Sequence, residues 1–257
     1  MHVMISQLLD IPSELEILKK PPSELFFVGN CDLLHSKKIS IVGTRRPISY
    51  TKEQTFKLAQ KFSQIGYCIV SGAAMGVDAI AHRGSFPNTI AVMANSLDYQ
   101  YPAVNRTLIN DIYKNSLALS EYKEDYRATK YSFVIRNRIV VALGEVLIIS
   151  EADENSGTMR SAKIALDLGK KIFVLPHRLG ESRGTQKLLS EGNAELILDI
   201  DEFVGRFGQV QKSNDPFLIY CQSTPLLSEA LAKFGTNVYE YELEGKIKIE
   251  NLKVYLL

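Results

Sequence analysis

The fold is decided by residues 38–76, which read KISIVGTRRPISYTKEQTFKLAQKFSQIGYCIVSGAAMG. A short β-branched run at 39–42 is followed by a helical pattern over Tyr50–Ile65, which Gly66 ends, and then by a second such run at 67–70. A strand, an amphipathic helix and a second strand with short connections are typical of a right-handed parallel crossover unit. The stretch therefore predicts the beginning of a parallel sheet with helices packed on it.

The same alternation continues to about residue 175. Further buried strands are predicted at 89–93, 117–119, 146–149 and 172–175, and further helices at 77–85, 104–113, 132–143 and 158–168. This alternation predicts an α/β protein with a Rossmann-like, doubly wound and mostly parallel sheet.

Smaller parts flank the predicted sheet domain, which spans 37–207. Residues 1–36, interrupted by Pro12, Pro21 and Pro22, are predicted to form an N-terminal helical extension. The polar, aperiodic stretch 208–214 is predicted to be a linker. Residues 215–257 show three helical segments and then two β-like runs, which is the order of a winged helix, so a small winged-helix-like C-terminal domain is expected.

Composition and charge indicate a soluble globular protein. The 257 residues are 46% hydrophobic and 23% charged, which argues against disorder, and the net charge of +1 means that any affinity for nucleic acid must come from a local patch. Cys31, Cys68 and Cys221 are odd in number and widely spaced, as expected of free thiols in a reducing compartment. With no secretion signal and no apolar stretch long enough for a bilayer, a cytoplasmic location without a membrane partner is expected.

Ligands of open parallel sheets bind outside the carboxyl ends of the strands, where helix N-termini present free amides. After the opening strand, Gly43 lets the backbone approach a phosphate, and Arg45 and Arg46 could grip it through two donors each. We favour phosphate or nucleic-acid contact here over two merely solvated arginines.

Two further strand ends carry weaker signals. Ser71 and Gly72 open a loop of small residues, but glycines at such a turn are often structural. Ser156, Gly157 and Thr158 open the helix after the fifth strand, where amides and hydroxyls form an anion pocket or an ordinary helix cap.

The segment Tyr126–Arg138 is the most informative. It interleaves cations with aromatic residues and contains no carboxylate: Arg127, Lys130, Arg136 and Arg138 with Tyr126, Tyr131 and Phe133. Cations that follow a phosphate backbone and rings that stack on unpaired bases are typical of single-strand binding. A solvated basic helix start with core aromatics is the alternative, and for Phe133 composition does not separate the two.

Catalytic and metal-binding patterns are weak. The four histidines do not cluster with ligand spacing, and no cysteine pair sits at a ligand-like interval, so no metal or other cofactor is expected. Asp78 and His82 share a helix face, which more often means a structural hydrogen bond than an acid–base pair. Gly72–Gly76 is not a full dinucleotide fingerprint, which disfavours a nicotinamide enzyme.

Taken in order, these strings resemble the DprA/Smf family of DNA-processing proteins of natural transformation. The residues that carry the resemblance are IVGTRR at 41–46, VSGAAMGVD at 70–78, Phe133 with Arg136-Asn137-Arg138, Ser156-Gly-Thr158 and Val174-Leu-Pro176. The resemblance covers residues 39 to about 204, and the ordered set is far more specific than any single motif.

The resemblance implies a cytoplasmic, sequence-nonspecific single-stranded DNA-binding protein. Such a protein protects incoming DNA, helps to load the RecA recombinase, forms homodimers and is not an enzyme. The resemblance also implies a DNA-binding pocket at or near Gly43, Arg45, Ser71, Gly72, Lys130, Phe133, Arg136, Asn137, Arg138 and Ser156–Thr158. Arg46 is a further candidate, because it follows the opening strand beside Arg45.

Three positions depart from the family pattern. The third strand ends in Met93-Ala94-Asn95 without a glycine, Val134 replaces the proline after Phe133, and His177 replaces the glycine after Pro176. Local loop geometry is therefore expected to differ at these points.

The C-terminal part is acidic. Residues 215–257 contain four lysines and six acids, a net charge of −2, and Glu240, Glu242 and Glu244 lie in the third predicted helix. A winged helix that reads duplex DNA needs a basic helix there. We predict that this part docks a protein or modulates a dimer.

Two other functions stay open. A nucleoside-monophosphate phosphoribohydrolase-like enzyme shares this layout and a Gly-Thr helix start, but carries a glutamate three residues after the threonine, where this chain has Ser161. A small-nucleotide-binding module is the second alternative.

Overall fold

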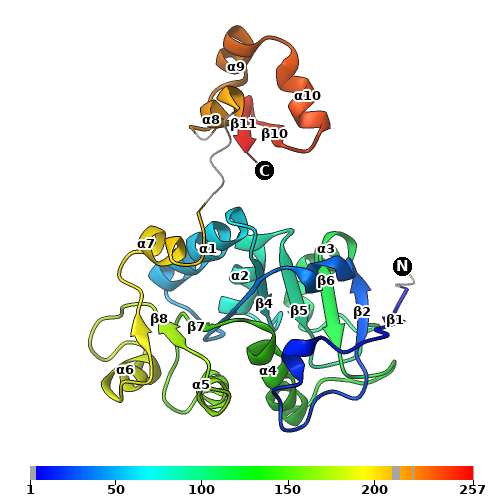
Figure 1. Cartoon of the computed structure of the whole chain (residues 1–257), viewed down its shortest axis with the longest axis vertical. Helices are drawn as coiled ribbons and strands as arrows, with labels where there is room; N and C mark the ends of the chain where they lie inside the picture. The colour runs from blue at the N-terminus through cyan, green and yellow to red at the C-terminus, as the bar shows by residue number, and fades with distance from the viewer. Residues whose placement is uncertain (1–3, 210–214, 222, 257) are drawn as a thin grey trace. The chain divides into compact units, whose positions relative to one another are not determined.

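The structure, a computed structural model, describes residues 4–209, 215–221 and 223–256. It consists of two units, Met1–Gly208 and Gln209–Leu257. Figure 1 shows the elements of both units along the chain.

In the described part of the first unit, nine strands form one sheet in the order β1-β2-β6-β5-β4-β3-β7-β8-β9. Their bounds are Ser6–Gln7 (β1), Phe26–Gly29 (β2), Lys38–Val42 (β3), Cys68–Ser71 (β4), Thr89–Val92 (β5), Leu117–Ser120 (β6), Leu147–Ile149 (β7), Ile172–Val174 (β8) and Glu195–Leu196 (β9). The neighbouring strands of the part β6-β5-β4-β3-β7-β8-β9 are all parallel to each other. The pairs β1–β2 and β2–β6 are antiparallel. The sheet is therefore mostly parallel, as predicted.

The helices cover both faces of the sheet. Their bounds are Ser49–Gln64 (α1), Val77–Ser85 (α2), Arg106–Asn115 (α3), Lys130–Leu143 (α4), Gly157–Asp167 (α5), Arg183–Ser190 (α6) and Ile200–Gly205 (α7). Apolar residues of α4, α5 and α6 share one buried cluster with the sheet, while those of α1, α2, α3 and α7 belong to two other clusters. This arrangement confirms the doubly wound, Rossmann-like fold.

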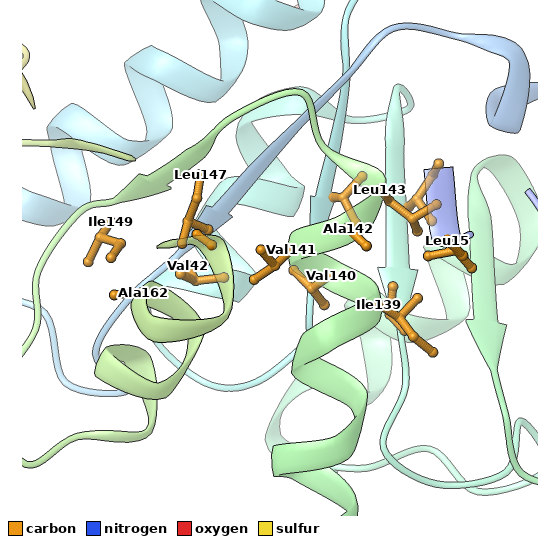
Figure 2. Close-up of a cluster of buried hydrophobic side chains, with 14 of the residues drawn as sticks. Leu15, Val42, Ile139, Val140, Val141, Ala142, Leu143, Leu147, Ile149 and Ala162 are labelled. Carbon is orange, nitrogen blue, oxygen red and sulfur yellow. The ribbon is translucent and has the colours of Figure 1, made fainter. Parts of the chain in front are cut away.

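The parallel strands β3–β8 are buried along their whole length. Burial on both faces explains why these strands are mostly apolar; the polar residues Lys38 and Ser40 of β3 are buried with hydrogen-bond partners. Figure 2 shows the C-terminal half of α4, Ile139–Leu143, in the same cluster as Val42 and Leu147 of the sheet. This packing fixes the position of α4 over the middle of the sheet.

The order of the strands reverses at β3. From β3 the chain builds β4, β5 and β6 on one side, and then returns to place β7, β8 and β9 on the other side. The crevice at the carboxyl ends of β3 and β7 is the switch point at which such sheets bind ligands.

The N-terminal segment differs from the helical extension predicted for 1–36. Its described residues form the strands β1 and β2 and the 3-10 helices Ser13–Leu15 and Cys31–His35. The three prolines prevent a continuous helix, and β2 finds its hydrogen-bond partner in β6, which is distant in sequence. The ion pair between the buried Lys38 and Glu14, at 2.7 Å, ties this segment to the sheet.

The C-terminal unit contains α8 (Pro216–Cys221), α9 (Leu227–Phe234), α10 (Asn237–Leu243), β10 (Ile247–Glu250) and β11 (Lys253–Leu256). Strands β10 and β11 are antiparallel, and Leu226 forms a β-bridge with Lys253. Three helices followed by a hairpin agree with the winged-helix prediction. Residues 210–214 of the predicted linker lie outside the described residues.

Two other predictions concern the described chain as a whole. Cys31, Cys68 and Cys221 are free thiols, as predicted. Among the helices that the structure describes, none has the length and apolar character needed to cross a bilayer.

Gly84 allows α1 and α2 to approach closely. A Cβ at this position would lie 2.6 Å from the Phe56 carbonyl oxygen and 3.0 Å from the Ala59 Cβ. We expect Gly84→Ala to lower the free energy of unfolding by about 1–3 kcal/mol through overpacking, measured by urea denaturation. The control is Gly205→Ala, where a Cβ meets no atom within 4 Å; an equal loss in both variants would contradict the packing argument.

Candidate nucleic-acid interface

A groove of about 680 Å³ lies at the switch point of the sheet. Its walls come from the loop after β3, the loop between β4 and α2, the loop after β5, the first half of α4 and the first turn of α5. Its lining includes Gly43, Arg45, Lys130, Phe133, Arg136, Asn137, Ser156, Gly157 and Thr158, all of which are candidates from the sequence. Four other candidates, Arg46, Ser71, Gly72 and Arg138, are not part of the lining.

Arg45 and Phe133 meet across the groove. The Arg45 guanidinium carbon lies 5.2 Å from the centre of the Phe133 ring, within cation–π distance. The Phe133 ring also contacts the ring of Tyr101, with centroids 5.9 Å apart and planes inclined by 50°. Arg45 is exposed and Phe133 is half-buried, so a cation and a ring are presented together to the groove.

The start of α4 positions Lys130 and Phe133. Thr129 caps the helix: the Ser132 amide donates to Thr129 Oγ1 at 3.1 Å, and the Thr129 amide donates to Ser132 Oγ at 2.8 Å. Because this capping box begins the helix at Lys130, the side chains at 130, 133, 134 and 137 follow helical spacing along one face. These four residues line the groove.

Arg136 forms a buried floor of the groove instead of an exposed contact. It is 3% exposed and donates a hydrogen bond to the Val92 carbonyl oxygen at the end of β5. Burial lowers the pKa of Arg136 to about 10, with Asp78 opposing that change, so the side chain stays protonated at neutral pH. Arg136 therefore interacts mainly with groups inside the protein.

Gly72 packs directly against the guanidinium of Arg136. A Cβ at Gly72 would lie 2.0 Å from Arg136 Nη1, so a larger residue would displace the guanidinium from this position. Ser71 is fully buried, and its hydroxyl donates to the Ile41 carbonyl oxygen at 2.7 Å. Both residues of this strand end therefore fit the structural alternative stated for them.

Arg138 has a carboxylate partner that the local sequence does not reveal. Its Nη2 lies 2.5 Å from Glu121 Oε1, and both side chains are largely covered. Glu121 follows β6 and is remote from α4 in sequence. Arg138 is therefore not one of the unpaired cations that the segment Tyr126–Arg138 was expected to offer to DNA.

Asp78 and His82 organise the loop after β4. Asp78 accepts hydrogen bonds from the amides of Gly72, at 3.2 Å, and Ala74, at 3.4 Å. Burial raises the pKa of Asp78, while the charge of Arg136 acts in the opposite direction. Burial also lowers the pKa of His82 to about 3, so its neutral ring accepts from the Ala73 amide at 3.2 Å. Both side chains are therefore structural, but their hydrogen bonds go to the loop backbone and to Thr89 and not, as predicted, to each other.

The first turn of α5 also lines the groove. Ser156 Oγ accepts from the Met159 amide at 3.4 Å, so Ser156 is an N-cap. A Cβ built on Gly157 meets no atom within 4 Å, so the space beside this residue is open. Ser161, one turn further, is buried and contributes no carboxylate to the groove that it lines.

Tyr101 and Arg160 also line the groove and were missed as site residues. The contact of Tyr101 with Phe133 joins the loop after β5 to α4, which are distant in sequence. Arg160 is an exposed cation one turn into α5. No pattern in the sequence indicates that its side chain faces the groove. Among the residues that the structure describes, no group of three or more His, Cys, Asp or Glu side chains could hold a metal ion.

Comparison with known proteins gives a consistent family. The family model described as DNA recombination-mediator protein A matches residues 2–208. The chain is 34% identical to protein Smf of Synechocystis over 210 residues, which are 78% of this chain and 52% of that protein. It is 35% identical to DNA processing protein DprA of Bacillus subtilis over 187 residues, covering 70% of this chain and 63% of that protein. The chain thus spans between half and two thirds of the length of these curated relatives.

Solved structures agree with this relationship. DNA processing protein A from Helicobacter pylori, whose structure concerns its single-stranded DNA binding mode, superimposes with a TM-score of 0.79 at 45% identity, covering 80% of this chain and 96% of that one. DprA from Streptococcus pneumoniae superimposes with a TM-score of 0.73 at 32% identity, covering 79% of this chain and 74% of that one. The match to the family model over most of the chain, together with these relatives, shows that the chain belongs to the DNA recombination-mediator protein A family, also called DprA or Smf.

Proposed function

We propose that this chain binds single-stranded DNA without sequence preference in the groove at the switch point of its sheet. The observation that carries the proposal is the convergence of two exposed cations, Arg45 and Lys130, with the ring of Phe133 on one groove. Cations can follow the phosphates of an unpaired strand while a flat ring stacks on a base of any identity.

Each wall of the groove has a chemical role in this proposal. Arg45 offers a forked guanidinium to a phosphate, and Lys130, at the start of α4, offers a mobile point charge. The amides of Gly157 and Thr158, at the positive end of the α5 dipole, add neutral donors for a phosphate oxygen. Asn137, half-buried in the lining, supplies an amide that can donate or accept.

The family relationship supports the same ligand. The relative from Helicobacter pylori is described with a single-stranded DNA binding mode, and the family is described as a recombination mediator. We extend the proposal accordingly: this chain protects incoming DNA and helps to load RecA during natural transformation and recombination. Homodimer formation and a cytoplasmic location belong to the same proposal.

The groove lacks the chemistry of the enzyme alternative. The position of the glutamate in a phosphoribohydrolase is held by Ser161, which is 1% exposed. The carboxylate of Asp78, which lines the groove, is buried and already accepts hydrogen bonds from two backbone amides. We therefore propose a binding protein without catalytic activity.

Salt dependence separates the roles of the cations and the ring. Replacing Arg45 or Lys130 by alanine should weaken binding of a poly-dT oligonucleotide and flatten the log–log salt slope by about 0.7 for each lost phosphate contact. Phe133→Ala should weaken binding by about 1–3 kcal/mol at an unchanged slope, because stacking releases no counterions. Fluorescence anisotropy at several salt concentrations measures both quantities.

The matched control for this series is Arg83→Ala. Arg83 is exposed in the last turn of α2, which lies at the amino-end edge of the sheet because α2 leads into β5. We expect this variant to bind like the original protein. Identical slopes for the Arg45, Lys130 and Phe133 variants would reject the assigned roles.

The class of ligand is tested by competition. Poly-dT should bind more tightly than a duplex of equal length, because stacked and paired bases cannot reach Phe133. A nucleoside monophosphate should compete poorly, because it occupies one phosphate and one base contact only. Incubation with nucleoside monophosphates should release no free base; turnover would establish the enzyme alternative, and strong competition by the monophosphate would establish the small-nucleotide alternative.

A further inference from the structure

A second set of rings lies beside the groove. Tyr99, Tyr101 and Arg127, which we call the aromatic rim, belong to the two loops that follow β5 and β6. Tyr101 lines the groove, and Arg127 directly precedes Ala128 and Thr129, which also line it. The rim is therefore continuous with the groove through both loops.

The rim repeats the cation–ring pairing of the groove. The Arg127 guanidinium carbon lies 5.3 Å from the centre of the Tyr99 ring, and that of Arg45 lies 5.2 Å from the Phe133 ring. Tyr101 contacts Phe133, with ring centroids 5.9 Å apart. Tyr101 nevertheless remains 48% exposed. About half of its surface is therefore available to a ligand.

Hydrogen bonds hold the two loops together before any ligand arrives. The Ser96 amide donates to the Tyr126 carbonyl oxygen at 3.0 Å, and the Tyr126 amide donates to Ser96 Oγ at 2.9 Å. Asn95 is buried and donates through Nδ2 to the Tyr99 carbonyl oxygen at 2.6 Å. The Tyr99 hydroxyl donates to Asp125 Oδ1 at 3.3 Å. A preorganised surface of this kind loses little side-chain entropy on binding.

Charge alone does not attract a strand to the rim. Lys123 and Arg127 are offset by the carboxylates of Asp98, Glu124 and Asp125 in the same two loops. Stacking on an exposed ring is independent of this balance, because every base has a π-face. The interaction that the rim offers most strongly is therefore with a base.

We propose that the aromatic rim is a second base-binding subsite, which receives the strand as it leaves the groove. Tyr101 stacks on the base that neighbours the one on Phe133, and Arg127 contacts a phosphate beyond it. This inference rests on the proposed single-strand function and deepens it, because it makes the bound strand longer than the groove alone requires.

The test uses poly-dT oligonucleotides of increasing length with the full chain. The affinity of the original protein should rise with each added nucleotide until groove and rim are filled. Tyr101→Ala should reach its plateau at a shorter length and bind long oligonucleotides between about fivefold and about a hundredfold more weakly, at an unchanged salt slope. Tyr101→Phe keeps the ring and should bind like the original protein.

Two controls match these variants. Tyr239→Ala removes a tyrosine of similar exposure, 44%, from the C-terminal unit, and should leave the plateau length unchanged. Arg127→Ala should flatten the salt slope for long oligonucleotides but not for the shortest that bind, whereas Arg83→Ala should change neither.

The outcomes distinguish this inference from the proposed function. If the original protein binds no oligonucleotide, the single-strand function itself is overturned. If it binds, but Tyr101→Ala gives the same affinity and plateau as Tyr239→Ala, the groove stands and the rim subsite is overturned. A loss in Tyr101→Phe as large as that in Tyr101→Ala would also overturn it, because the ring would then not be the contact.

Discussion

The buried guanidinium of Arg136 is the contact on which the geometry of the groove depends. It joins α4 to the carboxyl end of β5 through the Val92 carbonyl oxygen, and it occupies the space that Gly72 leaves open at the end of β4. Burying a cation is costly unless its charge is compensated, and Asp78 supplies that compensation. Because α4 is fixed in this way, its first turn holds Lys130 and Phe133 in the groove that Arg45 also lines.

The cationic side chains at or beside the groove therefore have two roles: some hold the structure of the site together, and others remain exposed to a ligand. Arg136 is buried and donates to the Val92 carbonyl oxygen, and Arg138 is paired with Glu121. Arg45 and Lys130 remain exposed at the groove, and their effect is local in a chain whose net charge is only +1. The Phe133 ring contacts both Arg45 and Tyr101 of the rim, so a strand would meet charged and aromatic surface side by side.

The sequence predicts most of the sheet domain because its signals are local. Strands such as Lys38–Val42 are short segments rich in isoleucine and valine, and the helix at Ser49–Gln64 ends close to the predicted glycine stop. Prediction fails where the deciding partner is distant: β2 is set by its pairing with β6, and Arg138 by Glu121. The same limit explains why Phe133 was found as a candidate while Tyr101, its ring partner from the loop after β5, was not. The elements β9 and α7, with two and six residues, are too short to show a period.

Photocrosslinking of the full chain to poly-dT that carries 5-iododeoxyuridine, followed by peptide mapping, tests the central claim most directly. The iodinated base reacts with the side chain against which it stacks, so the mapped peptides report the path of the strand. We expect crosslinks at Phe133 and Tyr101, at the carboxyl-end edge of the sheet. Crosslinks confined to residues 215–257, or to the amino-end edge of the sheet, would contradict the account.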